Sequence, residues 1–237
     1  MAETPRAIHN LTLLKGLDRQ IVGTLAASMT EETWPKGWQI IGPSDSRQSV
    51  RFVTAGRVKI VRSNPTDARE LTLWLLGAGD GCFDFVSLFD GGAHAVSAWT
   101  LEEAHTLAAP MALWRRWLER FPTLRTAVHH CIAGRLRELT ELTSDLALHD
   151  TPTRLAHLLR RHFEGGREQL LHGLPQAELA AMIGSVRVVV SRLLGQLQRD
   201  GAVRLHRGAI AGVDLPALMQ RLEATAAPDR RPPPREL

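Results

Sequence analysis

The chain has 237 residues, of which 44% are hydrophobic and 23% are charged, and its formal net charge at pH 7 is +4. This length exceeds the roughly 100–150 residues of a typical domain and the composition is that of chains with hydrophobic cores, which excludes general disorder and predicts two domains. Two cysteines exclude a disulfide framework and a CxxC zinc site, and without a signal-peptide core or an apolar run of about 20 residues we expect a cytoplasmic protein.

The N-terminal half predicts a short helix followed by short strands. Apolar residues recur at helical spacing over residues 14–25. Four β-type segments follow, separated by turns rich in Gly, Asp and Pro: WQII, SVRFVTAGRVKIV, ELTLWLL and AVSAWTLEEAHTLAA. Regularly spaced short strands of this kind favour a β-sandwich or β-roll. Every tryptophan precedes Leu118, so the large aromatic core should lie in this half.

From Pro110 onward the apolar period becomes helical, with a break expected at Phe121-Pro122 and a long helix from about residue 123 to 148. Five apolar residues in this helix are spaced by 4, 3, 3 and 4 positions: Ile132, Leu136, Leu139, Leu142 and Leu146. This spacing is typical of a coiled-coil seam and favours a parallel homodimer. The alternative is that the stripe packs against its own domain.

The C-terminal region predicts a winged helix-turn-helix. Thr151 and Pro152 begin a helix that Gly165-Gly166 end, with Thr151 expected as the N-cap. A short helix QAELAAMI, a Gly184-Ser185 link, a helix VRVVVSRLLGQLQRDG and two short strands around residues 206–208 follow. The tail from about residue 226 is rich in Pro and Arg and is expected to be disordered.

The basic excess lies in this C-terminal region. Residues 1–149 carry 16 basic and 16 acidic side chains, whereas residues 150–237 carry 13 arginines against 9 acids. Within residues 186–207 there are five arginines and one acid, Asp200. A surface of this kind favours contact with nucleic-acid phosphates, and the alternative is a solvated helix face.

The helical period divides the second helix of the motif into two faces. The expected buried stripe comprises Val186, Val190, Leu193, Leu194 and Leu197. The open face comprises Arg187, Val188, Ser191, Arg192, Gly195 and Arg199. Arginine donates two hydrogen bonds to guanine, so Arg187 and Arg192 are candidate base readers, and Ser191 can contact a base edge or a phosphate. Val188 either meets a thymine methyl group or is an incidental exposed apolar residue.

Three ordered segments resemble one protein family. LPQAELAAMIGSVRVVVSRLLGQLQRDGAV resembles the helix-turn-helix of the CRP/FNR family (cyclic-AMP receptor protein and fumarate–nitrate regulator), whose pattern is ELAxxIGxSRETVSRxLxxLxxxGhI. GPSDSRQSVRFVTAGRVKIV is similar to the family's β-roll segment with its Gly-Arg-Val-Lys turn. GAGDGCFDFVSLFDGGAHAVSAWT lies where family members have GDxFGExxLFxxxxRxAxA.

The resemblance implies an α+β fold with four parts. These are an N-terminal β-roll sensor domain of the cyclic-nucleotide-binding-like jelly-roll type (1–122), a dimerisation helix (123–149), a winged helix-turn-helix (150–225) and a disordered tail (226–237). It also implies a homodimeric transcription regulator that binds a two-fold symmetric operator and works with RNA polymerase. The residues assigned to DNA are Arg187, Val188, Ser191, Arg192, Arg199 and Arg207. Most relatives have Glu where this chain has Val188, so the usual TGTGA-like or TTGAT-like half-site is in doubt.

The resemblance does not name the effector. Where cyclic-nucleotide binders have Gly-Glu and Arg-Ser or Arg-Thr, this chain has Phe83-Asp84 and Val96-Ser97. Loss of the arginine removes the bidentate phosphate partner, so cyclic AMP is expected to bind poorly or not at all. The alternative is an alignment displaced by one residue and an unusual pocket.

The cysteines and histidines bear on three other effector chemistries. An iron–sulfur cluster is not expected because no cysteine precedes Cys82. A haem that senses carbon monoxide or nitric oxide has candidate axial ligands in Cys82, His94, His129, His130 and Cys131. A thiol switch at either cysteine, and operation without an effector, are the remaining alternatives.

Two other classes of function, an enzyme and a protein-interaction module, are less consistent with the sequence than DNA binding. Neither Asp84 near His94 nor Glu102-Glu103 near His105 supports an enzyme, because such turn acids are usually solvated. A ligand-binding β-roll that acts through protein partners is the stronger rival. Such a module does not require the arginines of residues 186–207, so the sequence favours a DNA-binding regulator.

Overall fold

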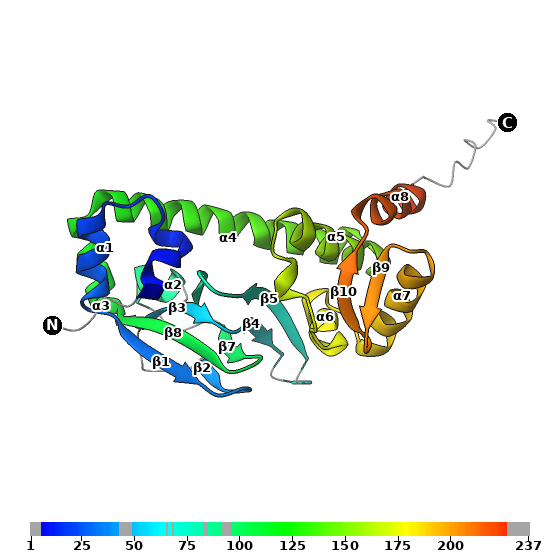
Figure 1. Cartoon of the computed structure of the whole chain (residues 1–237), viewed down its shortest axis with the longest axis horizontal. Helices are drawn as coiled ribbons and strands as arrows, with labels where there is room; N and C mark the ends of the chain where they lie inside the picture. The colour runs from blue at the N-terminus through cyan, green and yellow to red at the C-terminus, as the bar shows by residue number, and fades with distance from the viewer. Residues whose placement is uncertain are drawn as a thin grey trace. The chain divides into compact units, whose positions relative to one another are not determined.

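The computed structural model describes residues 6–42, 49–64, 66–67, 69–82, 85–91 and 96–226 (Figure 1). The chain divides into two compact units, residues 1–143 and 144–237. The effector candidates Phe83 and Asp84, the haem-ligand candidate His94 and the tail beyond residue 226 lie outside the described residues. No helix in the described ranges is long and apolar enough to cross a membrane.

Two antiparallel sheets form the β-roll of the first unit. One has the strand order β1-β8-β3-β6 and the other β2-β7-β4-β5. The strands are β1 (Thr30–Trp34), β2 (Gln39–Ile41), β3 (Ser49–Ala55), β4 (Val58–Ser63), β5 (Glu70–Leu76), β6 (Gly81–Cys82), β7 (Ser97–Thr100) and β8 (Ala104–Pro110). The predicted roll is confirmed, and the long segments that contain turns each divide into two strands.

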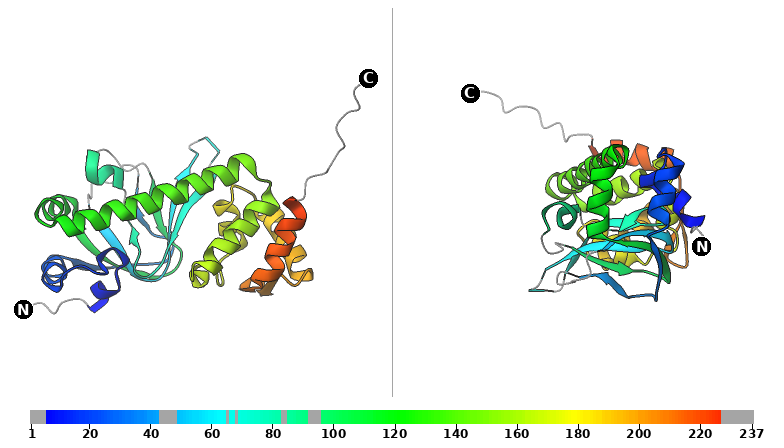
Figure 2. Two further views of the ribbon diagram at one scale, coloured as in Figure 1. Left: turned by 90° about the horizontal axis from the view of Figure 1, so that it is seen from above. Right: turned by 90° about the vertical axis from the view of Figure 1, so that its left-hand side faces the viewer.

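The helices of the first unit cover one sheet. They are η1 (Arg6–Asn10), η2 (Thr12–Leu14), α1 (Arg19–Ala26), α2 (Phe85–Asp90), α3 (Met111–Arg120) and α4 (Pro122–Leu148). Figure 2 shows α4 running across the strands of the roll. The break at Phe121 is confirmed, and α4 begins one residue earlier than predicted because proline is well suited to the first helical position.

The first unit has two cores, one on each face of the sheet that contains β3. Phe52 and Val50 pack toward the helices, where Phe52 and Trp114 have ring centroids 5.5 Å apart. Val53 points into the roll with Trp34 and neighbouring aliphatic side chains. Alternation of side chains along a strand produces this division, and it confirms an aromatic core in the N-terminal half.

The second unit follows the predicted order of helix, turn, helix and hairpin. Its elements are α5 (Thr151–Glu164), η3 (Glu168–Leu170), α6 (Gln176–Met182), α7 (Arg187–Arg199), β9 (Val203–His206), β10 (Ala209–Val213) and α8 (Leu215–Ala226). Figure 2 shows α8 beside α5, and this last helix was not predicted. Asp214 begins α8, since its carboxylate accepts a hydrogen bond from the Ala217 backbone N–H at 3.0 Å.

Two sequence-based assignments in this unit are wrong. The N-cap of α5 is Asp150, whose carboxylate accepts from the Thr153 backbone N–H at 3.0 Å, and Thr151 is the first helical residue. Val186 does not belong to the buried stripe of α7, because it is 58% exposed. It lies at the N-cap in an extended conformation, so the helical period that placed it on the buried face does not yet apply.

Candidate nucleic-acid interface

The turn between α6 and α7 sets the position of the second helix. Gly184 has a positive φ of 60°, a conformation that glycine adopts without strain. The Ser185 backbone N–H then donates to the Ala180 carbonyl at 2.9 Å, which closes the end of α6. The Gly184-Ser185 link predicted from the sequence is therefore confirmed.

The buried face of α7 fixes which side chains face outward. Four residues of the predicted stripe are buried: Val190, Leu193, Leu194 and Leu197. The side chains assigned to DNA on this helix are all exposed: Arg187, Val188, Ser191, Arg192 and Arg199. Val188 is 78% exposed, so it has no packing role in the second unit. The two-face division predicted from the period holds for α7 itself.

The N-terminus of α7 has the character of an anion site. Val186 at the N-cap has no side-chain atom that can accept a hydrogen bond from the first amides of the helix. Those amides lack intrahelical partners, and the positive end of the helix dipole lies with them. A phosphate oxygen can accept hydrogen bonds at this position.

The hairpin after α7 carries another arginine at its tip. Arg207 and Gly208 have positive φ values of 50° and 80°, as a two-residue hairpin turn requires. Gln176 at the start of α6 donates from Nε2 to the Gly208 carbonyl at 2.7 Å, which ties the tip to the helix-turn-helix. The Arg207 side chain is exposed.

The arginines of residues 186–207 are available for an anionic partner. No ion pair joins Arg187, Arg192, Arg199, Arg204 or Arg207 to another residue of the described chain. The one acid in the segment, Asp200, pairs with Arg221 of α8. Because Asp200 is already partnered, the field at this surface is dominated by unneutralised arginines.

The predicted dimer seam is partly exposed in the single chain. Leu136 is 64% exposed, and Leu139, Leu142 and Leu146 are half-buried. Ile132 instead packs against the helical core of its own unit. The alternative interpretation of the stripe, packing within one domain, is therefore correct for Ile132 and does not account for Leu136.

The described effector candidates lie in different environments. Val96 is half-buried and packs against the interior core of the roll, and Ser97 is buried with its hydroxyl 3.4 Å from Gln39 Nε2. The haem-ligand candidates His129 and His130 are exposed on α4. Burial raises the pKa of the half-buried Cys131 thiol, which disfavours the thiolate needed for ligation or redox chemistry.

Sequence reasoning missed an ion pair of the roll whose arginine is buried and whose glutamate is partly exposed. Arg51 is 2% exposed, and its guanidinium donates from Nε to Glu32 Oε2 at 2.9 Å. Thr106 donates to the same oxygen at 3.1 Å and accepts from Trp34 Nε1 at 3.0 Å. No periodic signal identifies Arg51, because it lies between apolar residues of a strand that is buried on both faces.

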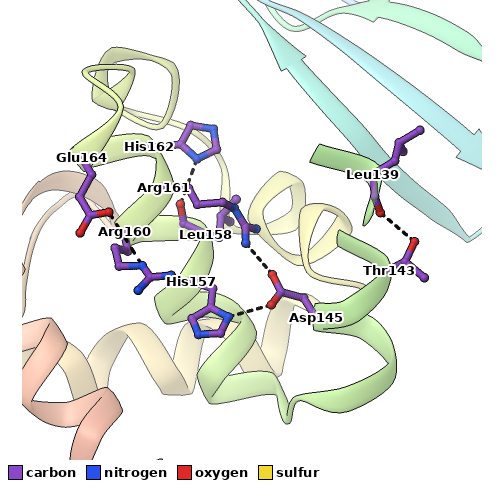
Figure 3. A network of polar contacts seen from close by, with 9 residues as sticks. All are labelled: Leu139, Thr143, Asp145, His157, Leu158, Arg160, Arg161, His162 and Glu164. Atoms are coloured by element: carbon purple, nitrogen blue, oxygen red, sulfur yellow. Dashed lines mark hydrogen bonds and ion pairs between the residues drawn. The ribbon is translucent and has the colours of Figure 1, made fainter. Parts of the chain in front are cut away.

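It also missed a polar cluster where α4 leads into α5. Asp145 is buried, and its carboxylate accepts from Arg161 Nη1 at 2.7 Å and lies 2.7 Å from His157 Nδ1 (Figure 3). Burial opposes ionisation of Asp145, but the hydrogen bonds from His157 and Arg161 outweigh it and hold its pKa below the usual value. The partners come from two helices, so no spacing in the sequence shows that they meet.

Comparisons with known proteins agree with this architecture. A family model, the Crp-like helix-turn-helix domain, matches residues 153–221. The cyclic AMP receptor protein of Thermus thermophilus is 30% identical over 198 residues, which cover 84% of this chain and 90% of that protein. The CRP-like cAMP-activated global transcriptional regulator of Mycobacterium tuberculosis is 27% identical over 215 residues, covering 88% of this chain and 95% of that one.

A solved structure extends the likeness to the whole fold. The structure of a CooA variant from Carboxydothermus hydrogenoformans superimposes with a TM-score of 0.71 and covers 94% of this chain and 97% of that one. Its sequence identity is 20%, so this likeness shows the fold alone.

Proposed function

Because this chain belongs to the CRP/FNR family of transcription regulators and carries that family's DNA-binding helix-turn-helix, we propose that it acts as a homodimer on a two-fold symmetric operator. The observation that carries the proposal is the set of arginines on and after α7 that pair with no acid of the described chain. A symmetric dimer presents two recognition helices about 34 Å apart, one DNA turn, so the half-sites should have that spacing.

The residues of α7 have distinct proposed roles. Arg187 and Arg192 donate to guanine O6 and N7 in the major groove. Ser191 contacts a base edge or a phosphate, and Val188 packs against a thymine methyl group. Arg199 and Arg207 bind phosphates, which position the module without reading sequence. RNA polymerase is the further partner that the family resemblance implies.

The dimer is proposed to form through the seam of α4. Leu136, Leu139, Leu142 and Leu146 present apolar surface along one stripe, and a coiled coil buries such a stripe between two helices. Ile132 lies at the N-terminal end of this stripe, where packing within the chain already covers part of it.

We propose that the regulator does not respond to cyclic AMP, although the two curated relatives are named for cyclic AMP. Val96 has no guanidinium for the nucleotide phosphate, and Ser97 is buried beside it. The haem alternative gains no support from His129 and His130, since both are exposed on α4.

The proposal is tested by selecting bound sequences from a random DNA library and measuring affinity for the selected duplex by fluorescence anisotropy. We expect a palindromic site, and we expect Arg187→Ala or Arg192→Ala to lower affinity by about 1–3 kcal/mol, roughly 5- to 150-fold. Arg19→Ala is the control, since Arg19 is an exposed arginine of the first unit.

Two outcomes would contradict these proposals. If the wild type, Arg187→Ala and Arg192→Ala bound DNA with equal affinity, these residues of α7 would not contribute to the DNA interface. An increase in DNA affinity on addition of cyclic AMP would show that the nucleotide is the effector despite Val96.

A further inference from the structure

Three side chains with metal-binding donor atoms meet where α4 ends and α5 begins. Asp145 lies in the last turn of α4, His149 directly follows that helix, and His157 lies in the second turn of α5. One donor atom from each lies within 4.8 Å of the other two. We propose that Asp145, His149 and His157 bind one divalent transition-metal ion of the zinc class.

The three donor atoms reach the spacing of such an ion if the His157–Asp145 pair opens slightly and the His149 side chain rotates. Zinc lies about 2.0–2.2 Å from nitrogen and oxygen ligands, so tetrahedral donors are roughly 3.3–3.5 Å apart. His157 Nδ1 and Asp145 Oδ1 are 2.7 Å apart, so they would separate slightly as the ion replaces their hydrogen bond, with the imidazole proton then carried on Nε2. His149 is exposed, and its ring is near the His157 ring at a centroid distance of 5.0 Å, so rotation can bring its nitrogen to the ion.

A further hydrogen bond holds the Asp145 carboxylate in place. Arg161 Nη1 donates to Asp145 Oδ2 at 2.7 Å, which fixes the carboxylate and leaves Oδ1 directed at His157 (Figure 3). Outer hydrogen bonds of this kind orient ligands in known metal sites. The positive charge of Arg161 opposes the ion, and the carboxylate between them offsets part of that repulsion.

The donor set defines the class of ion. Two imidazoles and one carboxylate suit zinc and neighbouring transition metals, whereas magnesium and calcium prefer oxygen ligands throughout. Three protein ligands leave a fourth position for water. Because the ligands come from both sides of the α4–α5 junction, a bound ion would restrict the angle at which α5 leaves α4.

The test is a calorimetric titration of metal-free, full-length protein with ZnCl₂. We expect one ion per chain. Binding should weaken about tenfold or more in His149→Ala and His157→Ala, since even loss of a residue that hydrogen-bonds to a metal ligand lowers metal affinity about 10- to 100-fold. His172→Ala is the matched control, because His172 is another exposed histidine of the same unit outside the cluster. Excess MgCl₂ should not compete, and Co²⁺ should give the absorption of a tetrahedral site.

Zinc binding by His149→Ala with unchanged stoichiometry and affinity would overturn the proposal, and so would the absence of zinc binding by the wild type. His149 is exposed, so its replacement should not prevent folding, and circular dichroism checks this for every variant. The titration contains no DNA, so its result is independent of the proposed operator binding. A second measurement compares DNA affinity with and without ZnCl₂. It rests on the proposed function and reports whether the ion regulates DNA binding.

Discussion

Val188 is the residue at which this chain departs most clearly from its family's DNA-reading pattern. Its side chain is 78% exposed on α7. Its methyl groups cannot accept a hydrogen bond from cytosine N4, as the glutamate of most relatives can. We expect Val188→Glu to gain preference for a C·G pair at one position of each half-site, by about 1–3 kcal/mol. Competition anisotropy with duplexes that differ at that pair measures the change. An unchanged base preference would mean that residue 188 does not face the bases.

Cys131 should be an unreactive thiol. Burial raises its pKa, and nearby Arg135 offsets only part of this effect, so little thiolate is present near neutral pH. In a Cys82→Ser background, we expect native protein at pH 8 to react with a disulfide reagent more slowly than a free cysteine does. Reaction should accelerate as pH rises and become fast in urea. Rapid labelling of the native protein would revive the thiol-switch hypothesis.

The exposure of a side chain could be predicted from the sequence where the residue lies within a continuous helix. Arg187, Ser191 and Arg192 follow the period of α7 and lie where the sequence places them. Val186 does not, because it precedes the first helical residue. Contacts such as that of Asp145 with His157 depend on how two helices meet, and the sequence gives no local signal for them.

At the scale of elements, α7 lacks a side-chain N-cap that the family pattern supplies. The pattern has serine at the position of Val186, which is extended and hence suitable for a cap. We expect Val186→Ser to raise the free energy of unfolding by about 0.5–2 kcal/mol, because its hydroxyl can accept from an amide of the first turn. Urea denaturation measures this, and Val188→Ser is the control, since it places the same side chain inside the helix. Equal stability of Val186→Ser and the wild type would show that the cap does not form.

The order of elements was predictable because each boundary has a chemical marker. Pro122 begins α4, Gly165 ends α5 and Gly184 ends α6. The α8 helix was not predicted although Asp214 caps it, because it lies beyond the hairpin that completes the winged helix-turn-helix pattern. The choice of Asp150 over Thr151 as the cap of α5 also depends on geometry, since both side chains are suitable acceptors.

For the whole molecule, the two-unit organisation was predicted from the length of the chain, but the boundary between the units was not. The structure divides the chain between residues 143 and 144, inside the long helix that the sequence assigned as a separate part. Helix α4 therefore contributes to both units. A continuous helical pattern contains no marker for such a division, because the division depends on which neighbours each turn contacts.

The dimer is the property of the whole molecule that one substitution can test. Leu136 is largely exposed in the single chain, so Leu136→Glu should leave each chain folded while placing a charge in the proposed seam. We expect the wild type to sediment as a dimer and Leu136→Glu to sediment mainly as a monomer at the same concentration, with weaker binding to a palindromic site. His130→Glu is the matched control, because His130 is an exposed residue of α4 outside the seam. Dimers of equal stability in both variants would exclude Leu136 from the interface, and retained palindrome binding by a monomer would mean that pairing occurs on the DNA itself.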